Sequence, residues 1–186
     1  RASALFNKDA AKAITTLMPI VRLMKSPEAA EWNTGQLPAW AEGIKERKNA
    51  RATTALLYSL FEGLGEPVPP AAWEALVGGD RVQVAMPSSA LWFRLLEATQ
   101  AARQGMGAGA EKKTAQASPA TVSDAAGGSS AQGPGPSRVG ETVLLAMMTL
   151  GEGGPTKASP ILLRQVLMSL RAVGFEPEAR AIAIEA

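Results

Sequence analysis

The chain has 186 residues, of which 46% are hydrophobic and 19% charged, enough apolar content for one substantial core or two small ones. It contains neither cysteine nor histidine, which excludes disulfides, thiol nucleophiles, histidine general bases and cysteine-based metal sites. The 19 lysines and arginines nearly balance the 17 aspartates and glutamates, and the net charge of +2 gives little support for nucleic-acid binding.

The composition also bears on the origin of the chain. No stretch approaches the roughly 20 consecutive apolar residues that a membrane span needs, so we expect a soluble protein. Richness in alanine, glycine, proline and arginine is typical of high-GC bacterial genomes, and we expect a bacterial protein of the cytoplasm or periplasm. The chain begins with arginine and ends inside a predicted helix, which indicates a processed product or a fragment of a longer chain.

The first elements are helices separated by proline and glycine. Asp9 is predicted to cap a helix that continues an apolar pattern to Lys25. Pro19 falls inside this pattern, so the helix must kink there or restart with the proline in its first turn. Ser26 and the proline after it predict a short second helix that reaches Trp32.

The middle of the chain predicts four more helices and one extended linker. A helix is expected over 37–48, and the charged run 45–51 is interpreted as its solvated end. Thr53 or Thr54 is predicted to cap the next helix, which ends at Gly65. A short helix over 71–77 follows, then an extended linker over 81–85. Pro87 is predicted to open a longer helix that ends near Gln104.

Residues 106–138 are built from alanine, glycine, serine, threonine, proline and glutamine, with almost no bulky apolar residue. Such a stretch cannot bury enough surface to offset its ordering entropy. We therefore predict an N-terminal helical region over 1–105 and a flexible linker or loop over 106–138. Residues 139–186 are predicted to form a C-terminal helical hairpin and the start of a further helix.

The C-terminal part gives the clearest helical signals. A helix is predicted to start at Gly140, with its largest apolar side chains pointing inward: Val143, Leu144, Met147, Met148 and Leu150. Ser159 and Pro160 predict the cap and first turn of the next helix, whose apolar stripe continues to Val173. Gly174 is a natural C-cap, after which Phe175 can fold back onto the stripe. A last helix is expected from Glu176.

One pattern in the C-terminal part echoes the middle of the chain. Leu56-Leu57 through Leu64-Gly65-Glu66 has the same spacing as Leu144-Leu145 through Leu150-Gly151-Glu152, and a proline-opened helix follows each. The two segments predict an all-α fold of short helical hairpins, stacked as a bundle or as an α-solenoid-like repeat around a long flexible insert. Chance resemblance between two amphipathic hairpins is the alternative.

No motif for catalysis, cofactor binding or metal binding emerges. The glycine-rich run 151–154 follows a predicted helix, whereas a phosphate-binding loop follows a strand and precedes a Lys-Ser/Thr pair. Glu62 and Glu66 could imitate a glycosidase pair, but glutamates on the surface of a helix do so routinely. We therefore predict no catalytic, cofactor-binding or metal-binding residue.

The aromatic and methionine residues offer the better hint of function. Large aromatic rings either close the edge of a core or anchor a partner, and methionine adapts to irregular surfaces. The candidate partner-contact residues are Trp32, Trp40, Trp73, Met147, Met148 and Met168. We expect a non-enzymatic module that binds a protein partner; the alternative is an accessory helical domain of a larger bacterial enzyme whose catalytic part lies outside this chain.

Overall fold

The computed structural model describes the backbone of residues 2–77, 89–111 and 137–186, and the side chains of residues 13–77, 90–103 and 138–186. Within these ranges the chain forms eight α-helices and three short 3-10 helices, without a strand. The prediction of an all-α helical bundle is confirmed. The predicted linker 81–85 and most of the low-complexity stretch 106–138 lie outside the described residues.

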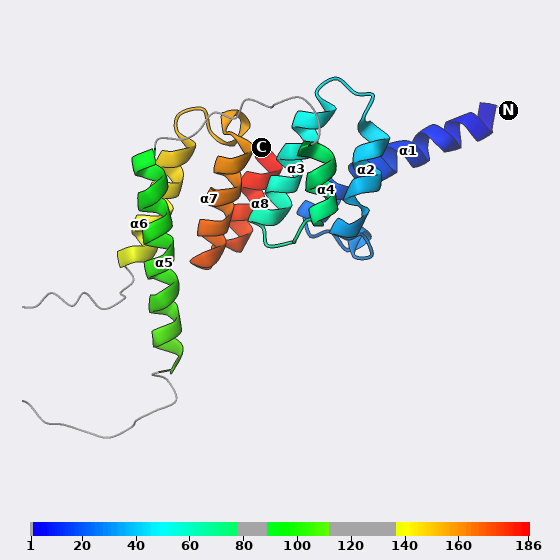
Figure 1. Cartoon of the computed structure of the whole chain (residues 1–186). Coiled ribbons are helices and arrows are strands. Elements are labelled where there is room, and N and C mark those ends of the chain that lie inside the picture. The colour runs from blue at the N-terminus through cyan, green and yellow to red at the C-terminus, as the bar shows by residue number, and fades with distance from the viewer. Residues whose placement is uncertain (1, 78–88, 112–136) are drawn as a thin grey trace, which may run out of the picture.

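The helices form a row across the molecule (Figure 1). Helices α5 and α6 lie at one end, α7, α8 and α3 in the middle, and α2 and α1 at the other end. The bounds are α1 (Ala2–Leu23), η1 (Pro27–Ala29), η2 (Thr34–Gln36), α2 (Leu37–Ile44), α3 (Ala50–Gly63), α4 (Pro70–Val77), α5 (Ser89–Glu111), α6 (Ser137–Leu150), η3 (Pro155–Lys157), α7 (Pro160–Ala172) and α8 (Glu176–Glu185).

Helix α7 is the centre of the bundle, because it contacts α3, α5, α6 and α8. Its side chains Leu163, Val166 and Leu167 are completely buried. They belong to the amphipathic stripe that the sequence predicts for this helix. Ser159 caps α7 by accepting a hydrogen bond from the backbone N–H of Leu162 over 3.4 Å, so the predicted cap is confirmed.

The hairpin pairing expected from the sequence echo is only half present. Helices α6 and α7 pack against each other, as the second hairpin requires. In the first copy, however, the principal partner of α3 is α7, and the principal partner of α5 is α6. The two copies therefore do not form equivalent hairpins, and the described helices build a bundle in which helices distant in sequence are neighbours.

The shared Leu-Gly-Glu element nevertheless has the same local function in both copies. Gly65 after α3 and Gly151 after α6 adopt left-handed φ angles of 78° and 66°. In each case the glycine ends the helix by the C-cap geometry that a residue without a β carbon adopts most readily. Gly174 ends α7 in the same way, with a φ of 91°, and Phe175 packs back onto the core as predicted.

Several predicted helix boundaries are wrong. Helix α2 ends at Ile44 and not at residue 48, and the short helix expected to reach Trp32 is the 3-10 helix Pro27–Ala29. Helix α1 begins at Ala2 and runs through Pro19, so Asp9 is not its cap. Helix α3 begins at Ala50, and the hydroxyl of Thr54 donates to the carbonyl oxygen of Ala50 one turn earlier instead of capping. Helix α5 continues to Glu111, because glycine lowers helix propensity without forbidding a helix.

Candidate protein-docking surface

Helices α5 and α6 pack against each other, and several small side chains of both helices are buried. The buried positions include Ala98 and Ala102 of α5 and Ala146 of α6. The hydroxyl groups of Thr99 of α5 and Ser169 of α7, both buried, are hydrogen-bonded to each other over 2.9 Å. Leu95 of α5 is completely buried as well, but other large apolar side chains of the two helices are exposed.

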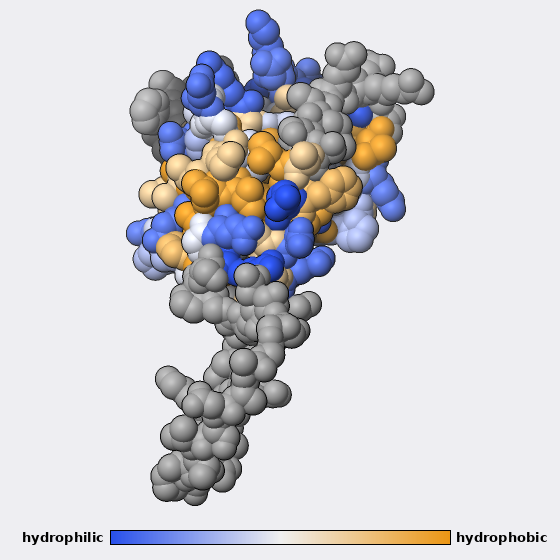
Figure 2. Space-filling model, turned by 90° about the vertical axis from the view of Figure 1, so that its left-hand side faces the viewer, coloured by the Kyte–Doolittle hydropathy of each residue, from blue (hydrophilic) through white to orange (hydrophobic). Residues whose placement is uncertain are grey.

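Four of these larger side chains are exposed and form what we call the α5–α6 face. Phe93 of α5 is 67% exposed, and Leu144, Met147 and Met148 of α6 are 61%, 58% and 53% exposed. Figure 2 views the molecule from this end and shows apolar residues gathered at the centre of this side, with hydrophilic residues among them and along part of their margin. An exposed apolar patch with a polar rim is typical of a surface that binds another protein.

Exposed charges of both signs lie on the same two helices. Arg94 and Glu97 are exposed on α5, and Glu141 is exposed on α6. Such a mixture does not match a polyphosphate backbone, which requires a cluster of cations. The α5–α6 face is therefore suited to a partner that offers apolar side chains and mixed polar groups.

The structure corrects the predicted orientation of α6. Leu144, Met147 and Met148 were expected to point inward, but all three are exposed. Helix α6 instead buries Thr142 and Ala146, while Val143 and Leu150 pack partly buried against the core, as predicted. Met147 and Met148 thus lie where a partner could contact them, whereas Met168 on α7 is half-buried.

The three candidate tryptophans lie in or against the core. Trp32 and Trp40 are 6% and 8% exposed, and the ring centroid of Trp32 lies 5.5 Å from that of Phe61. Trp73 is half-buried, and its indole N–H donates to the Oε1 atom of Glu62 over 2.7 Å. Trp32 and Trp40 therefore close the edge of the core and do not anchor a partner, since a buried ring cannot reach one.

Phe93 is not among the contact residues predicted from the sequence. The buried side chains in the described part of α5 are Leu95, Ala98, Thr99 and Ala102, and Trp92 is half-buried. The sequence does contain a signal for Phe93 as a surface residue. Leu95, Thr99 and Ala102 form a stripe at helical spacing, and Phe93 lies outside it. A large apolar residue outside the core stripe of a helix is a candidate for surface contact.

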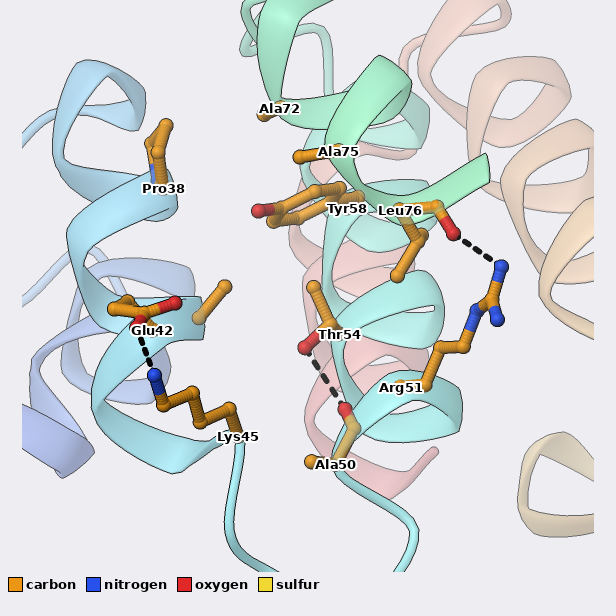
Figure 3. Close-up of a pocket in the computed structure, with 11 residues that line it drawn as sticks. Pro38, Glu42, Lys45, Ala50, Arg51, Thr54, Tyr58, Ala72, Ala75 and Leu76 are labelled. Atoms are coloured by element: carbon orange, nitrogen blue, oxygen red, sulfur yellow. Dashed lines mark hydrogen bonds and ion pairs between the residues drawn. The ribbon is translucent and has the colours of Figure 1, made fainter. Parts of the chain in front are cut away.

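A cavity of about 300 Å³ lies between α2, α3 and α4 (Figure 3). The hydroxyl of Tyr58 faces α2 and donates a long hydrogen bond, 3.5 Å, to the carbonyl oxygen of Leu37. Burial raises the pKa of Tyr58, so its hydroxyl stays protonated.

An ion pair lies at the edge of the cavity, between Lys45 and Glu42. The hydrogen bond between these two side chains raises the pKa of Lys45. The lining residues offer no nucleophile with an adjacent base.

The two glutamates that could imitate a catalytic pair are engaged with cations. The Oε2 atom of Glu62 lies 2.7 Å from the Nε atom of Arg164. Glu66 is bound by Arg22 over 3.0 Å and by Arg180 over 3.5 Å. Both carboxylates therefore hold helices together, and the described part of the chain contains no acidic cluster suited to a metal ion.

The chain matches no protein-family model, no curated protein and no solved structure. Among the described residues, no helix is both long and apolar enough to cross a membrane. The function is therefore inferred from the surface that the helices themselves present.

Proposed function

We propose that this chain is a non-enzymatic helical module that binds a protein partner through the α5–α6 face. The observation that supports this function is the exposure of Phe93, Leu144, Met147 and Met148 on two adjacent helices. Burying one such side chain completely stabilises a complex by about 1.5–3 kcal/mol. Four of them provide the apolar centre that a specific interface requires.

The chemistry of the face favours a partner that presents an apolar helix surface. Phe93 is a rigid anchor, whereas Met147 and Met148 are unbranched and adapt to the shape of an incoming side chain. A protein that binds an amphipathic helix contacts the apolar side chains along one face of that helix. The exposed Arg94, Glu97 and Glu141 then supply polar contacts around the apolar centre.

Site-specific photocross-linking tests this proposal in living cells. A photoreactive phenylalanine analogue would replace Phe93 in one variant and Met148 in another. Val77 on α4 is the matched control, because it is an apolar side chain with 73% exposure on a different part of the molecule. We expect the same partner to be cross-linked at both positions of the α5–α6 face and not at Val77.

Binding of the purified partner gives the quantitative test. Met148→Glu introduces a charge into the apolar centre and should weaken binding at least about tenfold, which corresponds to roughly 1.4 kcal/mol. Val77→Glu should leave binding unchanged, and circular dichroism should show both variants folded. Equal binding by wild type and Met148→Glu would refute a function of this face in recognition.

The alternative function, an accessory domain of a larger enzyme, also predicts a covered α5–α6 face. The exposure of the same four side chains supports the accessory-domain function as strongly as it supports the interaction module. The two functions differ in the identity of the cross-linked product. A separate polypeptide at Phe93 supports the interaction module, whereas a cross-link within one polypeptide supports the accessory domain.

A further inference from the structure

Two adjacent methionines lie in the apolar centre of the α5–α6 face. Met147 and Met148 are 58% and 53% exposed, and they supply two of the four large apolar side chains of this face. A change in the chemistry of their two thioether groups therefore alters half of the apolar side chains that the proposed function uses.

The composition of the chain makes these thioethers targets for oxidation. Methionine and cysteine are the two sulfur-containing side chains that peroxides oxidise. The chain has seven methionines and no cysteine, so no thiol of its own competes for the oxidant. The peroxide must reach the sulfur atom, and an exposed methionine is therefore oxidised before a buried one.

Exposure divides the methionines whose side chains the structure describes into two groups. Met24 on α1 is 57% exposed, which is similar to Met147 and Met148. Met18 on α1 and Met168 on α7 are half-buried. We therefore expect peroxide to oxidise the three exposed methionines first and to leave the fold intact, since none of these three side chains packs in the core.

The oxidation requires hydrogen peroxide and no other reactant. A lone pair of the sulfur atom attacks one oxygen atom of the peroxide, so that an S–O bond forms and the O–O bond breaks. After a proton transfer, the second oxygen atom leaves as water. The sulfur loses two electrons, the peroxide gains them, and the product is methionine sulfoxide.

A sulfoxide is unfavourable in the centre of an apolar interface. Its S–O group is a strong dipole and a hydrogen-bond acceptor, and an acceptor buried without a donor costs free energy. The side chains beside it on this face, Phe93 and Leu144, contain no donor. Oxidation of Met147 and Met148 therefore opposes the apolar burial that favours a complex.

We propose that Met147 and Met148 form a redox switch, in which oxidation of both to methionine sulfoxide by peroxide releases the partner of the α5–α6 face. This inference rests on the proposed function of that face. A methionine sulfoxide reductase reverses the switch. The dithiol of the reductase is oxidised to a disulfide, the sulfoxide oxygen leaves as water, and the thioether is restored.

Peptide mass spectrometry of the full chain after limited peroxide treatment tests the modification without a partner. Met147, Met148 and Met24 should be oxidised before Met18 and Met168. Circular dichroism should show unchanged helix content at that stage. Oxidation of Met168 before Met147 and Met148 would overturn the proposal.

Binding of the cross-linked partner tests the switch itself. The chain alone is treated with peroxide, catalase removes the excess, and untreated partner is then added. Oxidation should weaken binding by the wild type at least about tenfold, and a methionine sulfoxide reductase with dithiothreitol should restore it. Wild-type affinity in a protein whose Met147 and Met148 are both sulfoxides would overturn the switch.

Leucine substitutions provide matched variants. Leucine has a volume close to that of methionine but no sulfur. The double variant Met147→Leu with Met148→Leu should therefore bind the partner equally well before and after peroxide. Met24→Leu removes an equally exposed thioether outside the α5–α6 face, and this control should lose binding on oxidation as the wild type does. An equal loss by the double variant would contradict the assignment to Met147 and Met148.

Protection by the partner distinguishes failure of the switch from failure of the proposed function. Bound partner should slow the oxidation of Met147 and Met148 but not that of Met24. A partner that protects neither Met147 nor Met148 binds elsewhere, which refutes the proposed function and the switch with it. A partner that protects both methionines but still binds the oxidised protein refutes the switch alone.

Discussion

Gly63 of α3 lies directly against Leu167 of α7. A β carbon on Gly63 would be 2.9 Å from the β carbon of Leu167 and 3.1 Å from the carbonyl oxygen of Arg164. Both distances are shorter than ordinary van der Waals contact, so the absence of a side chain at Gly63 sets how closely the two helices approach. This approach joins the N-terminal helices to the C-terminal ones.

We therefore expect Gly63→Ala to destabilise the protein by about 1–3 kcal/mol, the usual cost of inserting a methyl group into a packed core. Gly43→Ala is the matched control, because Gly43 lies within α2 and no atom lies within 4 Å of its would-be β carbon. This control should stabilise the protein by up to about 1 kcal/mol through helix propensity. Urea unfolding of both variants measures the two effects, and an equal gain from both would contradict close packing at Gly63.

Leu167→Ala should be the costliest truncation along α7. Leu167 of α7 is completely buried against Gly63 of α3, and removal of a buried leucine side chain costs about 2–5 kcal/mol. Ile161→Ala on the same helix should cost less, because Ile161 is 39% exposed. Denaturant midpoints of the two variants give the comparison, and a loss below about 1 kcal/mol for Leu167→Ala would mean that the helix does not hold the centre of the core.

Trp40→Phe tests how α1 is attached to the bundle. The indole N–H of Trp40 donates to the carbonyl oxygen of Thr16 over 3.0 Å, and phenylalanine keeps an aromatic ring but loses this donor. We expect a loss of roughly 0.5–1.5 kcal/mol for the hydrogen bond alone, with a further loss from the smaller ring. Thermal unfolding measures the change, and wild-type stability in this variant would show that the bond contributes nothing to attachment.

Glu176 predicts a dependence of stability on pH. Its pKa is lowered from 4.5, first by the hydrogen bond from Lys25 and then by that from Arg180. The unfolded chain therefore binds the proton more tightly, and this carboxylate stabilises the folded state above pH 4.5. The contribution is lost as the pH falls through the lowered pKa of the folded state.

Unfolding free energies of wild type and Glu176→Gln, measured from neutral pH to below the pKa of Glu176, test this prediction. The difference between the two proteins should shrink as the pH falls. The effect should also weaken in high salt, because the Lys25–Glu176 pair is exposed. A difference that is constant with pH would mean that the carboxylate charge does not contribute.

Much of the fold was predictable because the signals are local. The proline and serine before α7 and the glycine after it mark the ends of that helix by backbone chemistry that needs no tertiary contact. The boundaries of α1 and α3 were not predictable in the same way. Asp9 and Thr53 are residues that favour caps, but a longer helix gives more backbone hydrogen bonds, and α1 and α3 extend past both.

The candidate docking surface was predictable only in part. The sequence identified Met147 and Met148 as possible contact residues, but their apolar spacing also assigned them to the core. Which side of α6 is buried depends on what α5 and α7 present to it, and they accept the side with Thr142 and Ala146. Trp40 shows the opposite case, since a ring with a possible surface function is buried by α1 and α3.

The sequence by itself determined the helical class, the missing cysteine and histidine chemistry, and the positions at which glycine ends the helices. These properties follow from composition and from the conformational preferences of single residues. The tertiary structure alone decided that α3 packs on α7 and α5 on α6, and which apolar stripes remain exposed. The physical reason is that an amphipathic helix specifies that one face is buried, whereas its partner depends on close fits between residues distant in the chain, such as Gly63 and Leu167.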